Sequence, residues 1–566
     1  MLNSVADSPA RFRPLLAAMG LALWLAAAGS PVAALAQPAG SDAVVVERIN
    51  ELIRRSWDDN EVTASAPVED GEFARRVSLD VVGRIPSLDE LTEFLEDDSP
   101  DRRQKLVDRL LDHDDYIRHW TTIWANRLVG RGGNRNGSRV ALEKWLRDAF
   151  YRNQPYDRMV YELVSASGPA AENGAVGFLA NHLNEGAVPA TSITSRIFLG
   201  MQVQCTQCHN HPFNDWKQSQ FWSMNAFFRG TRLSRGMERG EFGLDDAPQT
   251  GVIFFEKRSG LLEATTRRFV DGTGATGSSE IPPRVQLAEL MTDPEKPYLA
   301  RTEVNRMWGH LFGSGFTKPV DDMGPHNPPS HPELLDFLAV EFRRSGYDLK
   351  RLIRWIATSE AYQLSSRFSE SNSVDDPDAG NTPLFSRMYL KQFTAEQLYD
   401  SLLVATDAHR AGRGGEEAEN QRSVWLRQFV QTFGTDENDE ATTFNGTIPQ
   451  ALVMMNGQLM QNALSGAEGS FLRRVLESPT GRPEAAGSRR QKSKRPRGRK
   501  SGSARRRGVP AKIETLFLVT LARSPREEEL ERIDAVFREH GSQDPIAGLQ
   551  DVFWALLNSN EFIINH

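Results

Sequence analysis

The sequence predicts a mainly α-helical, multidomain protein with small β patches. Its 566 residues are enough for about three to four domains. Three Ser or Thr residues have a Glu or Gln three positions later, which is the spacing of a capping box at a helix start. These pairs are Ser87 with Glu90, Ser330 with Glu333, and Thr394 with Gln397. Strand-like sequence is limited to short patches such as residues 251–255.

Apolar residues recur at helical spacing in several stretches. One set follows Ser99-Pro100 and consists of Leu106, Leu110, Ile117 and Trp120. A second set consists of Leu334, Leu335, Leu338 and Phe342. Because residues three and four apart share one helix face, each set predicts a helix that buries one side.

Residues 1–36 have the pattern of a signal peptide. Arg11 and Arg13 precede an apolar run over residues 15–28, and Ala34-Leu35-Ala36 forms a small-x-small cleavage site. The run is short for a bilayer span, and no later stretch reaches eighteen uninterrupted apolar residues. We therefore expect export to the periplasm or cell envelope, with membrane contact only through the transient signal peptide. The alternative is an uncleaved N-terminal anchor.

The formal charge of -8 conceals a strongly basic segment. Residues 489–507 contain many Lys and Arg residues together with Gly, Ser and Pro, and no acid. Such a composition cannot bury apolar surface, so we predict a disordered basic insertion over residues 479–509. It has no aromatic residue to stack on bases, which argues against a specific nucleic-acid partner. We interpret it as a solvated insertion, whose charge could also bind an envelope polyanion.

The chain divides into three parts after the signal peptide. We expect residues 44–250 to form a first helical domain, residues 251–280 a linker with short strands, and residues 281–566 a second helical domain that contains the basic insertion. Within the linker, Gly272-Thr-Gly274-Ala-Thr-Gly277 fits a dinucleotide-binding pattern. However, serines and prolines follow it instead of a helix, so we interpret it as a flexible link.

A similar sequence occurs near both ends of the protein, as an internal repeat. Arg84-Ile-Pro86 leads to Glu90-Leu91, and Arg523-Ser-Pro525 leads to Glu529-Leu530. Each is followed by a related ending, at residues 110–116 and 556–562, and residues 356–362 resemble that ending too. We predict a helix–turn–helix pair used twice, for packing and not for chemistry.

The two cysteines of the chain lie in one motif, Cys205-Thr-Gln-Cys208-His209, with His211 two residues further on. Cys-x-x-Cys-His is the attachment pattern of a c-type haem, in which the thiols hold the porphyrin and the histidine binds the iron. The sequence therefore predicts a haem-c-like loop carrying one covalent haem. His211 is tethered to the same face of the ring as His209, so a sixth iron ligand must come from elsewhere. Four residues are open for that role: Met201, Met224, His182 and His310.

Other chemistry fits the same residues. Zinc could be held by Cys205, Cys208 and either His209 or His211, together with a remote ligand. The cysteines could also form a redox disulfide or a structural thiol pair.

A second polar stretch follows the predicted linker. It contains Arg306, His310, Asp321, Asp322, His326 and His331. These side chains could supply a distal haem ligand, a proton relay or a second metal site. The structural alternative is an ion pair between Arg306 and Asp321 or Asp322, with His331 at a helix start.

Five stretches together resemble a known family of large exported proteins that is abundant in planctomycetes. They are CTQCHNHPF from Cys205, FARRVSLDVVGRIPSLDELTEFL from Phe73, VNRMWGHLFGSGF from Val304, DDMGPHNPPSHPELLDFLAVEF from Asp321, and QALVMMNG from Gln450. In that family a cytochrome-type domain (PSCyt) precedes a second domain of unknown function (PSD). The resemblance covers the chain from about Val44 onward, apart from the basic insertion. The resemblance implies a cytochrome-like role for Cys205, Cys208 and His209. It also implies a link to polysaccharide metabolism, because members of the family are often encoded beside exported sulfatase-like proteins.

Two main functional hypotheses follow. The first is an exported c-type haem-binding protein with an electron-transfer or redox role and an unidentified redox partner. The second is a zinc-stabilised envelope binding protein or hydrolase linked to polysaccharide metabolism. The sequence has no serine nucleophile elbow, zinc-protease helix or phosphate loop on which a hydrolase mechanism could rest. A structural envelope component, whose cysteines brace a loop, is a third hypothesis.

Overall fold

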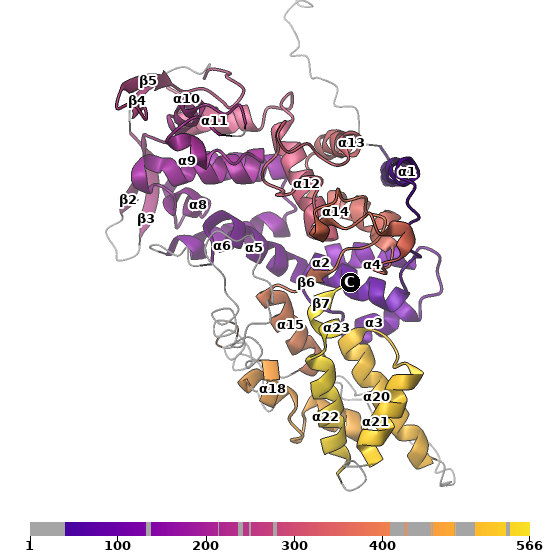
Figure 1. Ribbon diagram of the computed structural model, residues 1–566. Helices are drawn as coiled ribbons and strands as arrows, with labels where there is room; N and C mark the ends of the chain where they lie inside the picture. The colour runs from indigo at the N-terminus through magenta and orange to yellow at the C-terminus, as the bar shows by residue number, and fades with distance from the viewer. Residues whose placement is uncertain are drawn as a thin grey trace, which may run out of the picture. The chain divides into compact units, whose positions relative to one another are not determined.

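The computed structural model describes residues 40–566 except for 132–136, 213, 236–240, 248–250, 276–279, 408–423, 425, 427–453, 456, 480, 483–503 and 539–543. Residues Gly40–His566 form one compact unit, which is mainly helical with small sheets (Figure 1). The predicted signal peptide lies outside the described residues, as does most of the predicted basic insertion. Within these described ranges, no helix combines the length and the apolar character needed to cross a membrane.

The helices of the first half precede the predicted linker. They are α1 (Asp42–Asp59), α2 (Asp70–Val82), α3 (Leu88–Leu95), α4 (Arg102–Leu111), α5 (Asp114–Val129), α6 (Ser138–Tyr151), α7 (Tyr156–Ser165), α8 (Val176–Ala180), α9 (Asn184–Leu199), the 3₁₀ helix η2 (Gln204–Gln207) and α10 (Gln218–Asn225).

The helices of the second half follow the linker. They are α11 (Pro283–Met291), α12 (Tyr298–Phe312), α13 (Pro332–Arg344), α14 (Leu349–Ala357), η3 (Ala361–Gln363), η4 (Glu370–Asn372), η5 (Pro377–Ala379), α15 (Ala395–Thr406), α18 (Gln458–Ala463), α19 (Phe471–Glu477), α20 (Ala504–Leu521), α21 (Glu527–Val536), α22 (Pro545–Leu557) and α23 (Asn560–Ile563).

The strands form three small antiparallel sheets. β1 (Gly168–Pro169), β3 (Phe242–Asp246) and β2 (Thr231–Arg235) pair in that order. β4 (Val252–Glu256) and β5 (Leu262–Thr266) form a hairpin in the predicted linker, where the sequence predicts short strands. β6 (Lys391–Gln392) pairs with β7 (Ile564–Asn565), which ties the last residues of the chain to the middle of the second half.

Two of the three predicted capping boxes are present. Ser87 and Glu90 start α3, and Thr394 and Gln397 start α15. The third prediction is wrong, because α13 has His331 at its N-cap and Pro332 at its first position. Proline suits that position, since its fixed φ is helical and it lacks the amide that would be unpaired there. The Ser330 amide instead donates to the carbonyl of Phe316 at 2.8 Å.

Two hydrophobic clusters form the core, and both draw residues from before and after the predicted linker. The larger cluster contains the fully buried Trp120, Trp124, Trp308 and Trp355. The smaller cluster joins Leu79 and Ile85 to α15 and to the helices of the C-terminal segment. Packing therefore connects the two halves of the chain into one unit.

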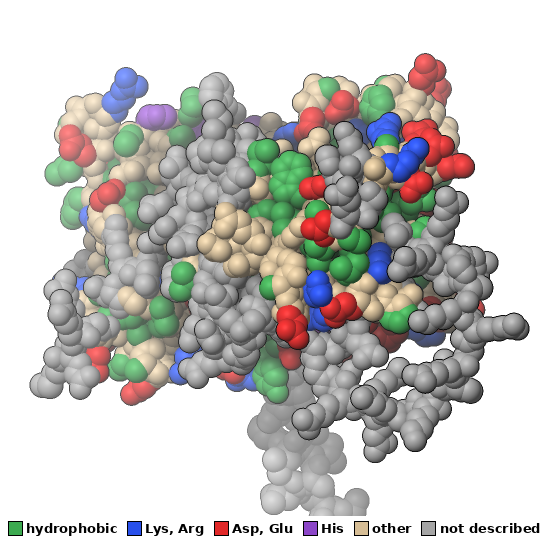
Figure 2. Space-filling view, turned by 90° about the horizontal axis from the view of Figure 1, so that it is seen from below, with side chains coloured by type: hydrophobic (Ala, Val, Ile, Leu, Met, Phe, Trp, Pro, Cys, Tyr) green, Lys and Arg blue, Asp and Glu red, His purple; other side chains and the backbone are tan. Residues whose placement is uncertain are grey.

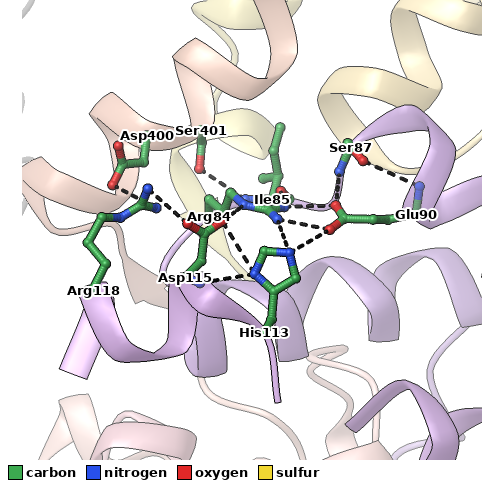
Figure 3. A network of polar contacts seen from close by, with 9 residues as sticks. All are labelled: Arg84, Ile85, Ser87, Glu90, His113, Asp115, Arg118, Asp400 and Ser401. Carbon is green, nitrogen blue, oxygen red and sulfur yellow. Dashed lines mark hydrogen bonds and ion pairs between the residues drawn. The ribbon is translucent and has the colours of Figure 1, made fainter. Parts of the chain in front are cut away.

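The sequence repeat corresponds to a repeated ion-pair cluster. Figure 3 shows the first copy, in which Arg84 donates to both oxygens of Glu90 at 2.8 and 2.9 Å and to Asp115 at 2.5 Å. In the second copy Arg523 makes the same contacts, with Glu529 at 2.7 and 2.8 Å and with Glu561 at 2.5 Å.

The residue before each arginine also matches between the copies, because Gly83 and Ala522 both have a positive φ, of 74° and 56°. Such a left-handed residue ends a helix and turns the chain toward the next one. The repeat thus fixes the turn between two helices, which agrees with the helix–turn–helix pair that the sequence predicts.

One face of the protein carries mixed charge. In the face shown in Figure 2, acidic and basic side chains lie close together in several places, between patches of hydrophobic side chains. Pairs of this kind at an exposed surface each contribute little to stability.

Candidate functional site

The Cys-x-x-Cys-His motif lies on a short turn at the surface. Helix α9 ends at Leu199, its C-cap residue Gly200 has a φ of 65°, and the chain then forms η2 over Gln204–Gln207. Thr206 is buried and fixes the turn, because its amide and its hydroxyl both donate to the carbonyl of Val203, at 2.9 and 2.6 Å. Cys205 and Cys208 are exposed and carry free thiols.

The turn rests on α10 and on the β4–β5 hairpin. The carbonyl of Gln207 accepts hydrogen bonds from the indole of Trp222 and from the side-chain amide of Gln218, each at 3.1 Å. The same Gln218 amide donates to the carbonyl of Glu256 at 2.9 Å. Trp222 also stacks on Phe255, with ring centroids 5.9 Å apart. These contacts hold the backbone of the motif from one side.

His209 has one ring nitrogen engaged. Its Nδ1 lies 2.6 Å from the carbonyl of Asn210, and a carbonyl can only accept, so Nδ1 carries the proton. Nε2 is then the nitrogen that offers a lone pair to a metal. Histidines that bind metals commonly donate their other N–H to a carbonyl in this way. Two exposed thiols and an oriented imidazole therefore fit the donor set of a c-type haem.

The zinc alternative uses Cys205 and Cys208 with either His209 or His211. His211 accepts the amide of Asn214 on its Nδ1 at 3.2 Å, which directs that nitrogen back into its own loop. Among the residues that the structure describes, no three His, Cys, Asp or Glu side chains are placed to hold one metal ion.

Part of the second predicted stretch lies against this motif. Asp321 accepts a hydrogen bond from Gln202 at 2.8 Å and pairs with Arg196 at 3.4 Å. The amide of Met323 donates to the carbonyl of Gly200 at 2.7 Å. Residues 321–323 are thus fixed to the segment that leads into Cys205.

His326 also lies near the cysteine motif. Its Nε2 lies 3.1 Å from a carboxylate oxygen of Asp322, and its ring centroid lies 6.3 Å from that of His211. The structure therefore places His326, with Asp322, beside the loop that follows Cys208, whereas Asp321 lies against the segment that precedes Cys205.

The remaining predicted residues of the second stretch lie elsewhere. Arg306 is buried in α12 with its guanidinium 3.5 Å from the carbonyl of Ile197. His310 contacts the carbonyl of Asp80 at 3.0 Å, and burial lowers its pKa to about 3. His331 packs on Phe385 with ring centroids 5.3 Å apart, and burial lowers its pKa to about 4. Both histidines are thus held neutral by the apolar core, where a charged imidazole would be poorly solvated.

The four candidates for a sixth iron ligand also differ in position. His182 has its Nε2 2.7 Å from the carbonyl of Leu128, and His310 has the contact to Asp80 described above. Met224 is buried. Met201 is the candidate that lines a cavity beside the motif.

That cavity has a volume of about 570 Å³ and lies between the cysteine motif and residues 323–329. Its apolar lining consists of Leu199, Met201, Trp216, Val270, Pro297, Tyr298, Met323, Gly324, Pro325, Pro328 and Pro329. Its polar lining consists of Asn214, Asp215, Gln220, Arg301, Thr302 and His326. Residues on both sides of Cys205 and Cys208 in the sequence therefore form part of its wall. The size and the mixed lining are typical of a small-molecule site.

The sequence predicted neither Tyr298 nor Met323 as a site residue, although Met323 directly follows the predicted Asp321 and Asp322. Tyr298 is far from the cysteine motif in the chain and belongs to no motif, and long-range contacts such as the bond from Met323 to Gly200 bring these segments together. The proline-rich segment Pro325–Pro329 was the one local signal of a rigid loop.

These features define a class: a mainly helical protein in which two sequence regions share one cavity beside a surface Cys-x-x-Cys-His turn. Residues 48–233 match the family model PSCyt2, a protein of unknown function (DUF1549). Residues 283–537 match PSD1, also a protein of unknown function (DUF1553). The chain belongs to the two-domain PSCyt2–PSD1 family. No curated protein and no solved structure matches it.

Proposed function

We propose that this chain is an exported c-type haem-binding protein with an electron-transfer or redox role in the cell envelope. The observation that carries the proposal is the arrangement of Cys205, Cys208 and His209 on one exposed turn, with the Nδ1 of His209 held by Asn210. The cytochrome-like name of the PSCyt2 model and the signal-peptide pattern of residues 1–36 support it.

In this proposal each residue of the turn has a distinct role. Cys205 and Cys208 anchor the macrocycle through thioether bonds, and His209 offers Nε2 to the iron. The carbonyl of Asn210 orients the imidazole and raises its basicity through the bond to Nδ1. The haem, when bound, supplies one-electron redox chemistry. The contacts of Gln207 with Trp222 and Gln218 keep the turn in place on the protein.

The test is production of the full chain in a host that exports it and carries the haem-attachment machinery. The denatured protein should retain haem on a gel and should show a c-type pyridine haemochrome spectrum with one haem per chain. The Cys205→Ser/Cys208→Ser double variant should lose both signals. Folded protein without covalent haem under these conditions would contradict the proposal.

Metal analysis of the same preparations tests the alternative, a zinc-stabilised envelope binding protein or hydrolase. One zinc per chain in the wild type, lost in Cys205→Ser, would favour that alternative over haem. The proposal predicts iron at one per chain and zinc far below it.

A further inference from the structure

We propose that the outer face of the β4–β5 hairpin docks on the surface of a lipid bilayer that carries anionic headgroups. Both strands lie between the two family regions, since PSCyt2 ends at residue 233 and PSD1 begins at residue 283. The proposal goes beyond the sequence prediction, which limits membrane contact to the transient signal peptide. It does not depend on the haem proposal, because Cys205, Cys208 and His209 are not part of the hairpin.

The inner face of the hairpin packs on α10 (Figure 1). Phe255 is buried and stacks on Trp222 at an interplanar angle of 11°. The hydroxyl of Ser223 lies 2.7 Å from the hydroxyl of Thr265. Because these contacts fix one face of the hairpin to the helix, the opposite face points away from it.

The outer face is apolar, whereas an antiparallel sheet usually presents polar residues to solvent. Val252, Phe254 and Leu262 are 42%, 64% and 72% exposed, and Leu261 beside them is 68% exposed. Exposed apolar side chains gathered in one patch mark an interaction surface. Alternation along the strands places six side chains on this face: Val252, Phe254, Glu256, Leu262, Ala264 and Thr266.

The turn between the strands adds positive charge beside this apolar face. The amide of Lys257 donates to the carbonyl of Leu261 at 2.8 Å, and Gly260 supplies the left-handed residue of the turn with a φ of 80°. Lys257 pairs with Glu263 at 2.5 Å, and Arg258 is exposed in the same turn. Basic residues outnumber acidic ones by four to two over residues 252–268: Lys257, Arg258, Arg267 and Arg268 against Glu256 and Glu263.

The size and the charge of the surface favour a bilayer over a protein partner. A stable protein–protein interface takes about 20–30 residues from each side. The hairpin offers only a few exposed apolar side chains. A bilayer interface accommodates a few Phe and Leu side chains, while Lys and Arg beside them contact anionic headgroups. The excess of positive charge on the hairpin complements such headgroups.

Docking would bring the cysteine turn close to the bilayer. The side-chain amide of Gln218 donates both to the carbonyl of Gln207, in that turn, and to the carbonyl of Glu256, the last residue of β4. One side chain thus joins the Cys-x-x-Cys-His turn to the loop end of the hairpin. The turn would therefore face the membrane region whatever group its cysteines hold.

The test is co-sedimentation of the exported, purified protein with lipid vesicles at about 0.1 M salt, where charge attraction is only partly screened. Phosphatidylcholine vesicles with about 30% phosphatidylglycerol should bind the protein about fivefold or more tightly than pure phosphatidylcholine vesicles. The Phe254→Ser/Leu262→Ser variant should bind the anionic vesicles about tenfold more weakly, because it removes two apolar side chains from the outer face. Arg258→Gln should weaken binding about fivefold.

The matched control is Val140→Ser/Tyr151→Ser on α6. Its two side chains are 63% and 74% exposed, so it removes a comparable apolar surface from a different element. Its vesicle binding should change less than about twofold. Every variant has the same N-terminus, so any contribution of residues 1–36 is common to all of them. Circular dichroism and melting curves establish that each variant is folded.

Carbene footprinting with mass spectrometry locates the contact. Labelling of residues 251–268 should fall when anionic vesicles are added, and labelling of Tyr151 should not. The same result is expected in Cys205→Ser/Cys208→Ser, which separates this inference from the haem proposal.

Equal vesicle binding by the wild type and Phe254→Ser/Leu262→Ser would overturn the inference. Equal binding of the wild type to neutral and anionic vesicles would overturn it as well. Sedimentation velocity tests a second copy of the chain as the occupant. A dimer that is lost in Phe254→Ser/Leu262→Ser, in a protein that does not bind vesicles, would replace the bilayer with that occupant.

Discussion

The backbone amide of Met323 donates a 2.7 Å hydrogen bond to the carbonyl of Gly200. Gly200 lies in the PSCyt2 region, shortly before Cys205, and Met323 lies in the PSD1 region. The bond therefore joins the two family regions at the cavity beside the cysteine motif. It also makes the position of the motif depend on residues that follow it by more than a hundred positions in the sequence.

Gly200→Ala should destabilise the protein through both backbone strain and crowding. The residue has a φ of 65°, and a Cβ there would lie 2.9 Å from Thr302 Oγ1 and 3.0 Å from Met323 Sδ. Left-handed strain costs about 1–2 kcal/mol, and overpacking adds about 1–3 kcal/mol. The measurement is the melting temperature against that of Gly346→Ala, which has a φ of 76° and open space around it. Equal losses in the two variants would contradict the crowding at Gly200.

Arg84→Lys and Arg523→Lys should have similar effects, because the two arginines occupy equivalent positions in the repeat. Lysine keeps the charge but cannot make the two parallel hydrogen bonds that each arginine makes to Glu90 or Glu529. We expect each variant to lose about 1–3 kcal/mol of stability.

The control for these two variants is Arg158→Lys, at an exposed pair with Glu162 on α7, which should lose less than about 0.5 kcal/mol. Urea denaturation followed by circular dichroism is the measurement. A loss at Arg84 without a comparable loss at Arg523 would show that the two clusters are not equivalent in energy.

His310 should make the protein less stable as the pH falls. Burial lowers its pKa from 6.5 to about 3, so the unfolded chain binds a proton at a pH where the folded chain does not. The neutral folded form is fully favoured above about pH 6.5, and stability is lost as the pH falls from there toward 3.

Between pH 7 and pH 5 this one group should account for about 2 kcal/mol of lost stability. The His310→Gln variant removes the titration, so its stability should fall less over the same interval, whatever its stability at pH 7. Denaturant titrations at pH 7, 6 and 5 provide the comparison. Identical pH dependence in the variant and the wild type would show that His310 titrates alike in the folded and unfolded chains.

The features that the sequence predicted well are local. The capping boxes at Ser87 and Thr394 and the two Arg-x-Pro clusters depend on side chains within a few positions of each other, so spacing alone carries the information. The Cys205–His209 motif is local too, and its role in binding haem stays a prediction. The third capping box failed because Pro332 competes for the helix start, and the proline effect is stronger than the spacing of Ser330 and Glu333.

The cavity could not be predicted, because its walls meet only through contacts between distant segments. Asp321 bonds to Gln202, and His326 lies beside His211, yet nothing in either local sequence indicates the other. His310 is near those residues in the sequence but points to Asp80 on α2 instead. His310 lies on α12, and Asp321, Asp322 and His326 lie in the loop that follows this helix. Their positions in space depend on where α12 packs, which the local sequence does not show.

Covalent haem content in the exported full chain is the measurement that tests the central proposal most directly. We predict one haem per chain that survives denaturation, and we predict that Cys205→Ser/Cys208→Ser loses both this haem and the c-type spectrum. A folded, exported protein that is colourless after maturation in a host with active haem attachment would contradict it.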